Sequence, residues 1–383
     1  MRISAGYIVK NEAANLPRSL TALGAVYDEL LVVDTGSTDA TVAIAERAGA
    51  RVLKYSWQDD FAAARNYLLE HCTGDWCIFL DADEWFVPTL TRQALAQVIA
   101  GALAPTGTVA EVQQLPADVL LVQRHNVDTD GTLIGEEWAC PRIVRVDPAL
   151  RYVGRIHEHI AYVGQPVRPL RTVQTPLVLQ HSGYAQTVAI DKVRRNLRIL
   201  QAEIATHGMQ PGYHYYLADC YYGLGDYRAA AREAEASIGD VVQMLGDGTH
   251  MYHVLLESLR HLGGQDALML TWAERGIAAF PAQPEFYAER GMTLCALGRL
   301  EEARQSLIEA LLRYEERGPR PEGGYFYAKQ AGYCAARLGE IMQLLGDDAE
   351  AATWYELAAR YAPQDQQVQD KIRRWQAQNA NID

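Results

Sequence analysis

Two aspartates one residue apart follow an apolar segment early in the chain. Residues 76–80, WCIFL, have the length and composition of a buried strand, and Asp81, Ala82, Asp83 and Glu84 come directly after them. In open α/β sheets, ligands bind at the carboxyl ends of the strands. Divalent cations such as Mg²⁺ and Mn²⁺ prefer oxygen ligands and often bind phosphates as well. The segment predicts either a cation site that holds a diphosphate or a strand that simply ends in an acidic turn.

Other early strands of the predicted sheet also end in polar side chains. A sheet core needs no such groups, so we expect them to converge on a ligand site at one edge of the sheet. Neither GxGxxG nor GxxxxGK[ST] is present, which argues against a dinucleotide fingerprint and against a P-loop. The polar groups are Asn11 and Glu12 after Ile3–Val9, Asp34 after Glu29–Val33, and Asp59 and Asp60 after Arg51–Tyr55, with Arg65 on the next helix.

Strands and helices alternate around these groups, which predicts a mostly parallel sheet with helices on its faces. Helices are expected at Asn15–Leu23, Ala40–Ala48 and Phe61–His71, and Ser37 or Thr38 is expected to cap the second. After Asp83 the alternation loosens, and we interpret residues 1–185 as one α/β domain. Its later half is expected to contain a helix at 88–103, strands at 119–124, 142–146, 151–163 and 177–180, and a polar segment at 126–138.

From about residue 187 the pattern changes to helices that repeat. Four segments have corresponding positions at the same internal offsets, filled mostly by small or turn-forming residues, and the second segment departs from this with Glu257 and Met269. A repeat of roughly 34 residues is typical of paired-helix solenoids. We divide this half into a connecting helix at 186–210, repeats at 211–363 and a capping helix or tail at 364–383. The four sets are Ala218, Gly225, Ala230 and Ser237; Glu257, Gly264, Met269 and Gly276; Gly291, Gly298, Ala303 and Ala310; and Gly339, Gly346, Ala351 and Ala358.

The composition of the chain excludes some classes of protein. A net charge of -13 over 383 residues argues against a nucleic-acid binder, because little is available to neutralise phosphates. The six cysteines show no CxxC pair and no zinc spacing, as expected of a reduced compartment. The N-terminal segment reads as a strand and not as a signal peptide, and no apolar run reaches the roughly 18 residues of a transmembrane helix. We expect a cytoplasmic protein without a transmembrane segment.

Four of these motifs together resemble family-2 glycosyltransferases of the GT-A fold. They are IVKNEAANL at 8–16, VVDTGSTDAT at 32–41, FAAARN at 61–66 and LDADEW at 80–85, in the order and spacing of that family. Together with GRIHEHI at 154–160, HSGY at 181–184 and the repeats, they look like the bacterial subgroup that includes peptide S- and O-glycosyltransferases. The resemblance implies an α/β GT-A domain followed by an all-α domain that resembles tetratricopeptide repeats (TPR).

Through this resemblance, the first two motifs are implied to bind the nucleotide of a UDP-sugar. Asp34 would accept hydrogen bonds from the uracil or the ribose, and Asn11, Glu12 and the backbone near Val9 would line the base pocket. A second interpretation stays open for Asp34, which could instead cap the following helix through its turn.

The LDADEW motif is implied to contact the sugar and the diphosphate. Asp81 would lean toward the ribose or the sugar with Ala82 beside it, and Asp83 would be a ligand of Mg²⁺ or Mn²⁺. Such a cation neutralises charge on the departing UDP. Arg65 would add positive charge near the nucleotide, or would pair with one of the two aspartates before its helix. Glu84 reads as a solvated acid without an assigned role.

A base that activates the acceptor is expected beyond the cation motif. Glu158 is our first candidate and His157 our second; if residues 154–160 form a regular strand, Glu158 lies on one face and His157 and His159 on the other. A half-exposed strand with solvated charges is the alternative. His181 looks like the late histidine that joins the aspartate on the metal in GT-A enzymes, or else it is a structural histidine in a turn.

We expect a metal-dependent inverting glycosyltransferase that moves a hexose or an N-acetylhexosamine from a UDP-sugar to a Ser, Thr or Cys side chain of a peptide or protein. Two alternatives stay open: a glycan or lipopolysaccharide acceptor, and a TPR-type scaffold whose glycosyltransferase domain is inactive. The repeats would hold the acceptor or would pair two subunits in a homodimer.

Overall fold

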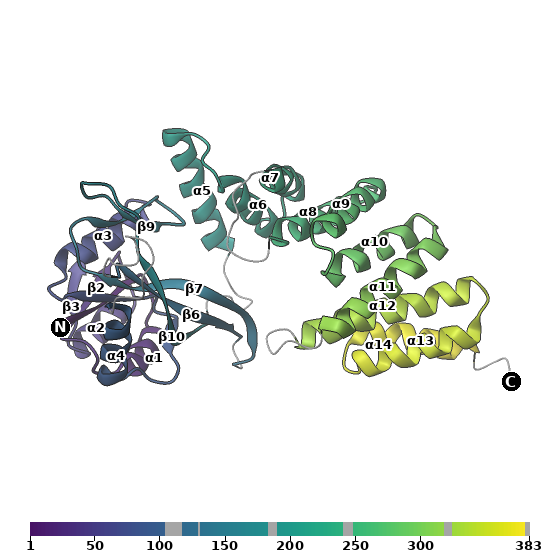
Figure 1. The fold of residues 1–383 in the computed structure, drawn as a ribbon, viewed down its shortest axis with the longest axis horizontal. Coiled ribbons are helices and arrows are strands. Elements are labelled where there is room, and N and C mark those ends of the chain that lie inside the picture. The colour runs from purple at the N-terminus through teal and green to yellow at the C-terminus, as the bar shows by residue number, and fades with distance from the viewer. Residues whose placement is uncertain (104–116, 129–130, 183–189, 240–247, 318–323, 380–383) are drawn as a thin grey trace, which may run out of the picture. The chain divides into compact units, whose positions relative to one another are not determined.

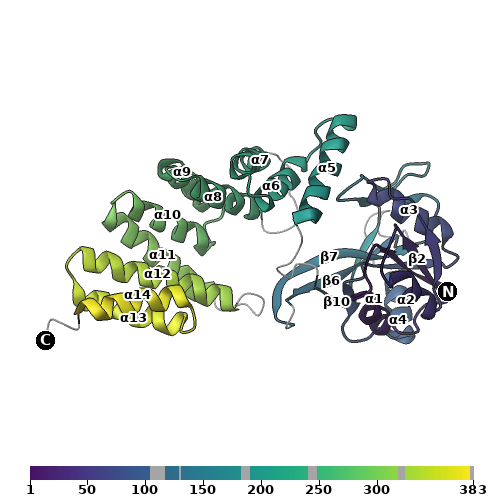
Figure 2. The same ribbon diagram turned by 180° about the vertical axis from the view of Figure 1, so that it is seen from behind.

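A computed structural model of the protein describes residues 1–103, 117–128, 131–182, 190–239, 248–317 and 324–379. The chain divides into two compact units, Met1–Gly208 and Met209–Asp383 (Figures 1 and 2). In the described parts of the chain, the strands all belong to the first unit, and the residues of the second unit form helices joined by short turns. The helix expected at 186–210 is α5 (Ile190–His207), and it is counted with the first unit.

One half of the sheet is parallel, as the alternation of strands and helices predicts. β1 (Ile3–Val9) lies between β2 (Glu29–Asp34) and β4 (Trp76–Leu80), and β3 (Arg51–Lys54) pairs with β2 at the edge. All of β4 and nearly all of β1 are buried, as expected of strands that helices cover on both faces. Because the four strands run in the same direction, the residues that follow them meet at one edge of the sheet.

The other half of the sheet is mixed. β7 (Leu133–Arg145) is antiparallel to β4 and β6 (Val119–Val127), β10 (Thr172–His181) is parallel to β6, and β5 (Glu84–Phe86) is antiparallel to β10. The expected extents at 119–124 and 142–146 were too short, because both strands continue into the polar segment between them. Antiparallel strands can expose one face to water, so polar residues do not end them. β5 has only three residues, so its sequence shows no recognisable alternation of apolar and polar positions.

A separate two-stranded sheet carries the loop with the candidate bases. β8 (Leu150–Val153) pairs with β9 (His159–Tyr162), and residues 154–158 form the bend between them. A regular strand over 154–160 is therefore not formed, and the expected alternation of faces was wrong. Gly154 has φ +92 and His157 has φ +54, values in the left-handed region that reverse the chain here.

Helices cover both faces of the large sheet. On one face, α1 (Leu16–Leu23), α2 (Thr41–Arg47) and α4 (Arg92–Leu103) pack on a core that includes Tyr7 and Ile78. On the other face, α3 (Phe61–His71) packs with β8 and β9 against Phe79. Gly6 permits this approach, because a Cβ there would lie 2.5 Å from Leu68 Cδ2.

The second unit contains the predicted repeats. Among its described residues, helices pair into four hairpins with one helix after them, and the turn glycines Gly225, Gly264, Gly298 and Gly346 all have positive φ. A Cβ at Gly291 would lie 2.6 Å from Leu307 Cγ, so glycine allows the third pair to pack closely. The helices are α6 (Tyr213–Gly223), α7 (Tyr227–Gly239), α8 (His250–Leu262), α9 (Asp266–Ala279), α10 (Pro284–Ala296), α11 (Leu300–Arg317), α12 (Gly324–Leu344), α13 (Asp348–Tyr361) and α14 (Gln366–Asn379).

In the part of the chain that the structure describes, every helix is too short or too polar to cross a membrane.

Candidate active site

The loops after β1 and β2 bind each other at the carboxyl edge of the sheet. Asn11 Oδ1 accepts a hydrogen bond from the Thr38 amide at 2.7 Å, and the Asn11 amide donates to Ser37 Oγ at 3.0 Å. Ser37 and Thr38 therefore do not cap α2, and that prediction was wrong. The N-cap of α2 is Ala40, which makes no side-chain hydrogen bond.

Asp34 lies at the centre of these two loops. It is 6% exposed and accepts hydrogen bonds from the amides of Ser37 at 3.0 Å and Gly36 at 3.4 Å. A carboxylate has about four lone-pair positions, so these bonds leave capacity for a ligand. The Val9 carbonyl accepts from the amide and the hydroxyl of Thr35, each at 3.0 Å. The structure brings Val9, Asn11 and Asp34 together, and their contact with a base stays a prediction.

Glu12 lies close to the acidic motif. Its carboxylate accepts a hydrogen bond from Asn15 Nδ2 at 2.8 Å. Burial raises the pKa of Glu12; the bond from Asn15 lowers it, and the negative charges of Asp83 and Asp81 raise it again. The three acids therefore repel one another, and a bound cation would relieve that repulsion.

Asp81 lies between two arginines. Arg65 Nη2 is 3.4 Å from Asp81 Oδ1, and Arg142 Nη2 is 3.1 Å from Asp81 Oδ2. Partial burial disfavours the charged carboxylate, but the positive charges of Arg142, Arg65 and Arg124 outweigh it and hold the pKa of Asp81 well below its usual range. Asp81 is therefore ionised and held in position before any ligand binds.

Glu84 is fully buried, so its interpretation as a solvated acid was wrong. Arg142 Nε and Nη2 bind its two carboxylate oxygens, each at 2.7 Å, and Arg124 Nη1 lies 3.2 Å from Oε1. This bidentate pair fixes the plane of the Arg142 guanidinium. Glu84 thereby holds Arg142 against Asp81.

Arg65 pairs across the site and not with the aspartates before its own helix. Its Nε is 2.5 Å from Glu158 Oε1, and the two side chains are 12% and 13% exposed. Asp60 instead caps α3, and Asp59 accepts a hydrogen bond from Arg198 at 2.7 Å. Arg65 therefore links the loop of residues 154–158 to the acidic motif.

The loop of residues 154–158 presents the two candidate bases differently. Glu158 lies inside the site on Arg65, whereas His157 is exposed at the bend. The Arg155 carbonyl accepts a hydrogen bond from the Phe61 amide at 2.8 Å, which fixes the loop to the start of α3. The structure places both candidates at the edge of the sheet that carries the acidic motif, and the role of base stays a prediction for each.

Asp83 and His181 form a pair suited to a divalent cation. Asp83 Oδ2 is 3.6 Å from His181 Nε2, and His181 Nδ1 is 2.8 Å from Asn126 Oδ1. A hydrogen bond from Nδ1–H to Asn126 leaves Nε2 as the nitrogen with the lone pair that a metal needs. The two side chains thus fit two positions of a cation whose others are filled by phosphate and water. No group of three or more His, Cys, Asp or Glu in the described ranges forms a metal cluster.

Replacing Asn126 by alanine is expected to weaken manganese binding by about 10- to 100-fold, because His181 loses the partner that orients its ring. Manganese alone, titrated into the full chain and followed by the paramagnetic resonance of free Mn²⁺, measures this directly. Asn126→Asp keeps an acceptor oxygen and is the matched control. Equal affinity in Asn126→Ala and the unaltered chain would show that the bond from His181 to Asn126 does not support metal binding.

The sequence interpretation missed Arg142, Arg124 and Asn126. They lie on β6 and β7, at least 40 positions from the acidic motif, so no local spacing connects them to it. One signal was present: Arg142 comes directly before the apolar Ile143 and Val144, inside an expected strand. A charged side chain next to such a run needs a counter-charge if the strand is buried.

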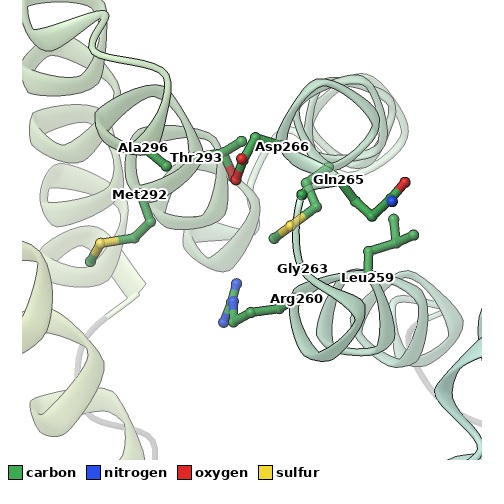
Figure 3. Close-up of a pocket in the computed structure, with 10 residues that line it drawn as sticks. Leu259, Arg260, Gly263, Gln265, Asp266, Met292, Thr293 and Ala296 are labelled. Atoms are coloured by element: carbon green, nitrogen blue, oxygen red, sulfur yellow. The ribbon is translucent and has the colours of Figure 1, made fainter.

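The second unit contains a pocket of its own, of about 190 Å³, where α8, α9 and α10 meet (Figure 3). Met269 and Met292 give it flexible apolar walls. Thr293 is 3% exposed, and its hydroxyl lacks a hydrogen-bond partner among the described residues. Arg260, on the wall, already pairs with two glutamates. The pocket is suited to a small side chain with an apolar body and one polar atom.

The family model "Glycosyl transferase family 2" matches residues 4–138. The matched range includes β1 to β6 and the residues Asp34, Arg65, Asp81 and Asp83. The resemblance to family-2 glycosyltransferases is confirmed for the first unit, which carries a domain of this family. Arg142, Glu158 and His181 lie beyond the matched range.

Among the relatives of this chain, one is named as a TPR protein and another as a glycosyltransferase. A "TPR repeat-containing protein" of Synechococcus elongatus is 52% identical over 83 residues, 22% of this chain and 21% of that protein. The "SPbeta prophage-derived glycosyltransferase SunS" of Bacillus subtilis is 26% identical over 203 residues, 52% of this chain and 44% of that protein. The chain therefore covers less than half the length of these relatives. Among solved structures, TTC0263, a TPR protein of Thermus thermophilus, is 19% identical with a TM-score of 0.35, covering 50% of this chain and 94% of that one.

Proposed function

We propose that the glycosyltransferase family 2 domain of this chain transfers a hexose or an N-acetylhexosamine from a UDP-sugar to a Ser, Thr or Cys side chain of a peptide or protein, by a metal-dependent inverting reaction. The observation that carries the proposal is the convergence of Asp34, Asp81, Asp83 and His181 at one edge of the sheet, with Asp81 already ionised between Arg65 and Arg142. Such a set can hold a nucleotide diphosphate and its sugar.

Each group of residues has a distinct part in this proposal. Asp34, with Asn11, Glu12 and Val9 around it, receives the uridine, and Asp81, with Ala82, faces the ribose or the sugar. Asp83 and His181 are the residues that would hold Mn²⁺ or Mg²⁺, a cation that neutralises charge on the leaving diphosphate. The two arginines fix the direction of the Asp81 carboxylate, so little ordering is needed when the donor binds.

The base is proposed to come from the loop of residues 154–158. Glu158 is already paired with Arg65 through one carboxylate oxygen. It can therefore act on the acceptor only if this ion pair opens or if its second carboxylate oxygen contacts the acceptor. His157 lies exposed at the bend of the same loop. Separate Glu158→Gln and His157→Asn variants distinguish the two, because loss of the base lowers kcat by about 10²- to 10⁴-fold while UDP binding is retained.

The second unit is proposed to hold the acceptor or a second copy of the chain. Stacked helix pairs form extended surfaces, and the pocket between α8, α9 and α10 could receive one acceptor side chain. A carrier glycan is the alternative acceptor, and no described feature favours it over a peptide.

The test of this function begins with calorimetric binding of UDP to the full chain in Mn²⁺, in Mg²⁺ and in EDTA. We expect binding that requires the cation, and then transfer from one of a panel of UDP-sugars to a peptide library, detected as a mass increase. Absence of UDP binding in every condition would show that the domain is not a working UDP-sugar enzyme. Binding with transfer only to glycans would retain the domain and replace the acceptor.

A further inference from the structure

Helix α5 contacts the first unit through charged and aromatic side chains. Arg198 Nη2 binds Asp59 Oδ1 at 2.7 Å, and the Arg195 guanidinium lies 5.1 Å from the ring of Phe61. Glu203, which is 7% exposed, lies 3.3 Å from Arg155. Asp59 and Phe61 follow β3 at the carboxyl edge of the sheet, so α5 lies against the edge that carries the candidate site.

Arg195 is a half-buried cation without an acidic partner. Its Nε and Nη2 both donate to Asn196 Oδ1, a neutral amide, at 3.2 and 3.0 Å. Among the described residues, no carboxylate lies within ion-pair distance of it. Burial lowers the pKa of Arg195; the charge of Asp59 raises it, and the neighbouring Arg198 lowers it. A partly desolvated charge without a counter-charge is unfavourable until an anion binds beside it.

The position of Arg195 relates it to the donor residues already described. Phe61, beneath its guanidinium, lies one helical turn before Arg65 on α3, and residues four apart share a helix face. Lys192 precedes Arg195 by three positions and so lies on the same side of α5. The charge of Lys192 acts on Glu12, where it opposes the rise in pKa caused by burial. This side of α5 thus contacts the residues after β3 through Arg195, and the charge of Lys192 acts near the end of β1.

Three other arginines near the site are already paired with carboxylates. Arg65 is paired with Glu158 and Asp81, Arg142 with Glu84 and Asp81, and Arg198 with Asp59. A diphosphate that binds beside three acids needs positive charge besides that of a cation. Guanidinium groups suit phosphate oxygens, because two parallel N–H donors match two acceptors.

We propose that α5 forms one wall of the nucleotide-sugar site and that Arg195, assisted by Lys192, binds the diphosphate of the donor. This inference rests on the proposed function, since it places the same nucleotide sugar in the same site. It gives the last helix of the first unit a specific part in donor binding, beyond that of a connector.

The test compares Arg195→Ala with Arg194→Ala on the full chain. Arg194 is the neighbouring arginine, 66% exposed and paired with Asp191 on the surface of the same helix. Binding of UDP and of uridine is measured by calorimetry in saturating Mn²⁺, and circular dichroism verifies that each variant is folded. We expect Arg195→Ala to weaken UDP binding by about tenfold or more, because a hydrogen bond to a charged group is lost, and uridine binding to change by less than about twofold. Arg194→Ala should match the unaltered chain, and Arg195→Lys should recover part of the loss.

The outcomes separate this inference from the proposed function. If the unaltered chain binds UDP and Arg195→Ala binds it equally well, α5 does not contact the diphosphate, and the proposed function is unaffected. An equal loss of uridine and UDP in Arg195→Ala would mean that the residue supports the shape of the base pocket, which also contradicts the inference. If the unaltered chain does not bind UDP, the proposed function and the role of α5 fail together.

Discussion

Replacing Asp83 by asparagine is expected to lower the rate of sugar transfer by about a thousandfold or more. Asparagine has nearly the same shape but lacks the negative charge, so the pair with His181 would bind a cation far more weakly. A bound cation contributes several kcal/mol of charge stabilisation to the leaving diphosphate, which corresponds to a factor of about 10³ in rate.

The measurement combines rates with binding, because a loss of rate alone does not identify the cause. UDP affinity is measured with Mn²⁺ and with EDTA in the unaltered chain, in Asp83→Asn and in Asp370→Asn. Asp370 pairs with Arg373 on α14, so its loss should leave both quantities unchanged. Asp83→Asn should bind UDP with the same weak affinity in Mn²⁺ and in EDTA. If it keeps the manganese dependence of the unaltered chain, Asp83 is not a metal ligand.

The sequence predicted the positions of the candidate site residues correctly where one short segment contains both a strand and the polar side chain that follows it. The segment at 76–84 predicts β4 and, directly after it, the position of Asp81 and Asp83. The same holds for Asp34 at the end of β2, since an apolar strand and the residue that follows it are adjacent in the chain. Parallel pairing then brings these ends together without further information.

Residues that act through long-range contacts could not be placed in this way. Glu84 looks solvated beside two other acids, and only the pairing of β4 with β7 shows that Arg142 reaches it. Glu158 was expected on a strand, whereas the turn at Gly154 and His157 directs its side chain toward Arg65. Left-handed φ at a histidine has no signal in a single sequence, because the surrounding contacts determine it.

Replacing Arg142 by methionine is expected to destabilise the first unit by about 3–5 kcal/mol. The change removes both short bonds to Glu84, which is fully buried and would keep only Arg124 and the Asp81 amide as partners, each at 3.2 Å. Loss of its closest ionic partner leaves this buried carboxylate only partly compensated, which is strongly unfavourable. Methionine fills similar space, so the predicted loss does not arise from a cavity.

Hydrogen exchange followed by mass spectrometry suits this prediction, because the chain has two units and a single unfolding transition is not assured. Peptides from β4 and β7 should exchange faster in Arg142→Met, whereas peptides from α10 and α11 should not change and so provide an internal reference. Arg299→Met removes an exposed pair with Glu302 and should alter neither set.

A second variant determines whether charge is the cause. In the double variant Glu84→Gln with Arg142→Met, the buried carboxylate is neutral and needs no guanidinium, so much of the lost protection of β4 should return. Transfer activity should stay low even so, because Asp81 has lost the arginine that lowers its pKa and fixes its direction. If stability and activity return together, Arg142 only supports the fold. If stability returns and activity does not, the buried ion pair with Glu84 holds Arg142 in position against Asp81. Arg142 and Glu84 are then part of the donor site.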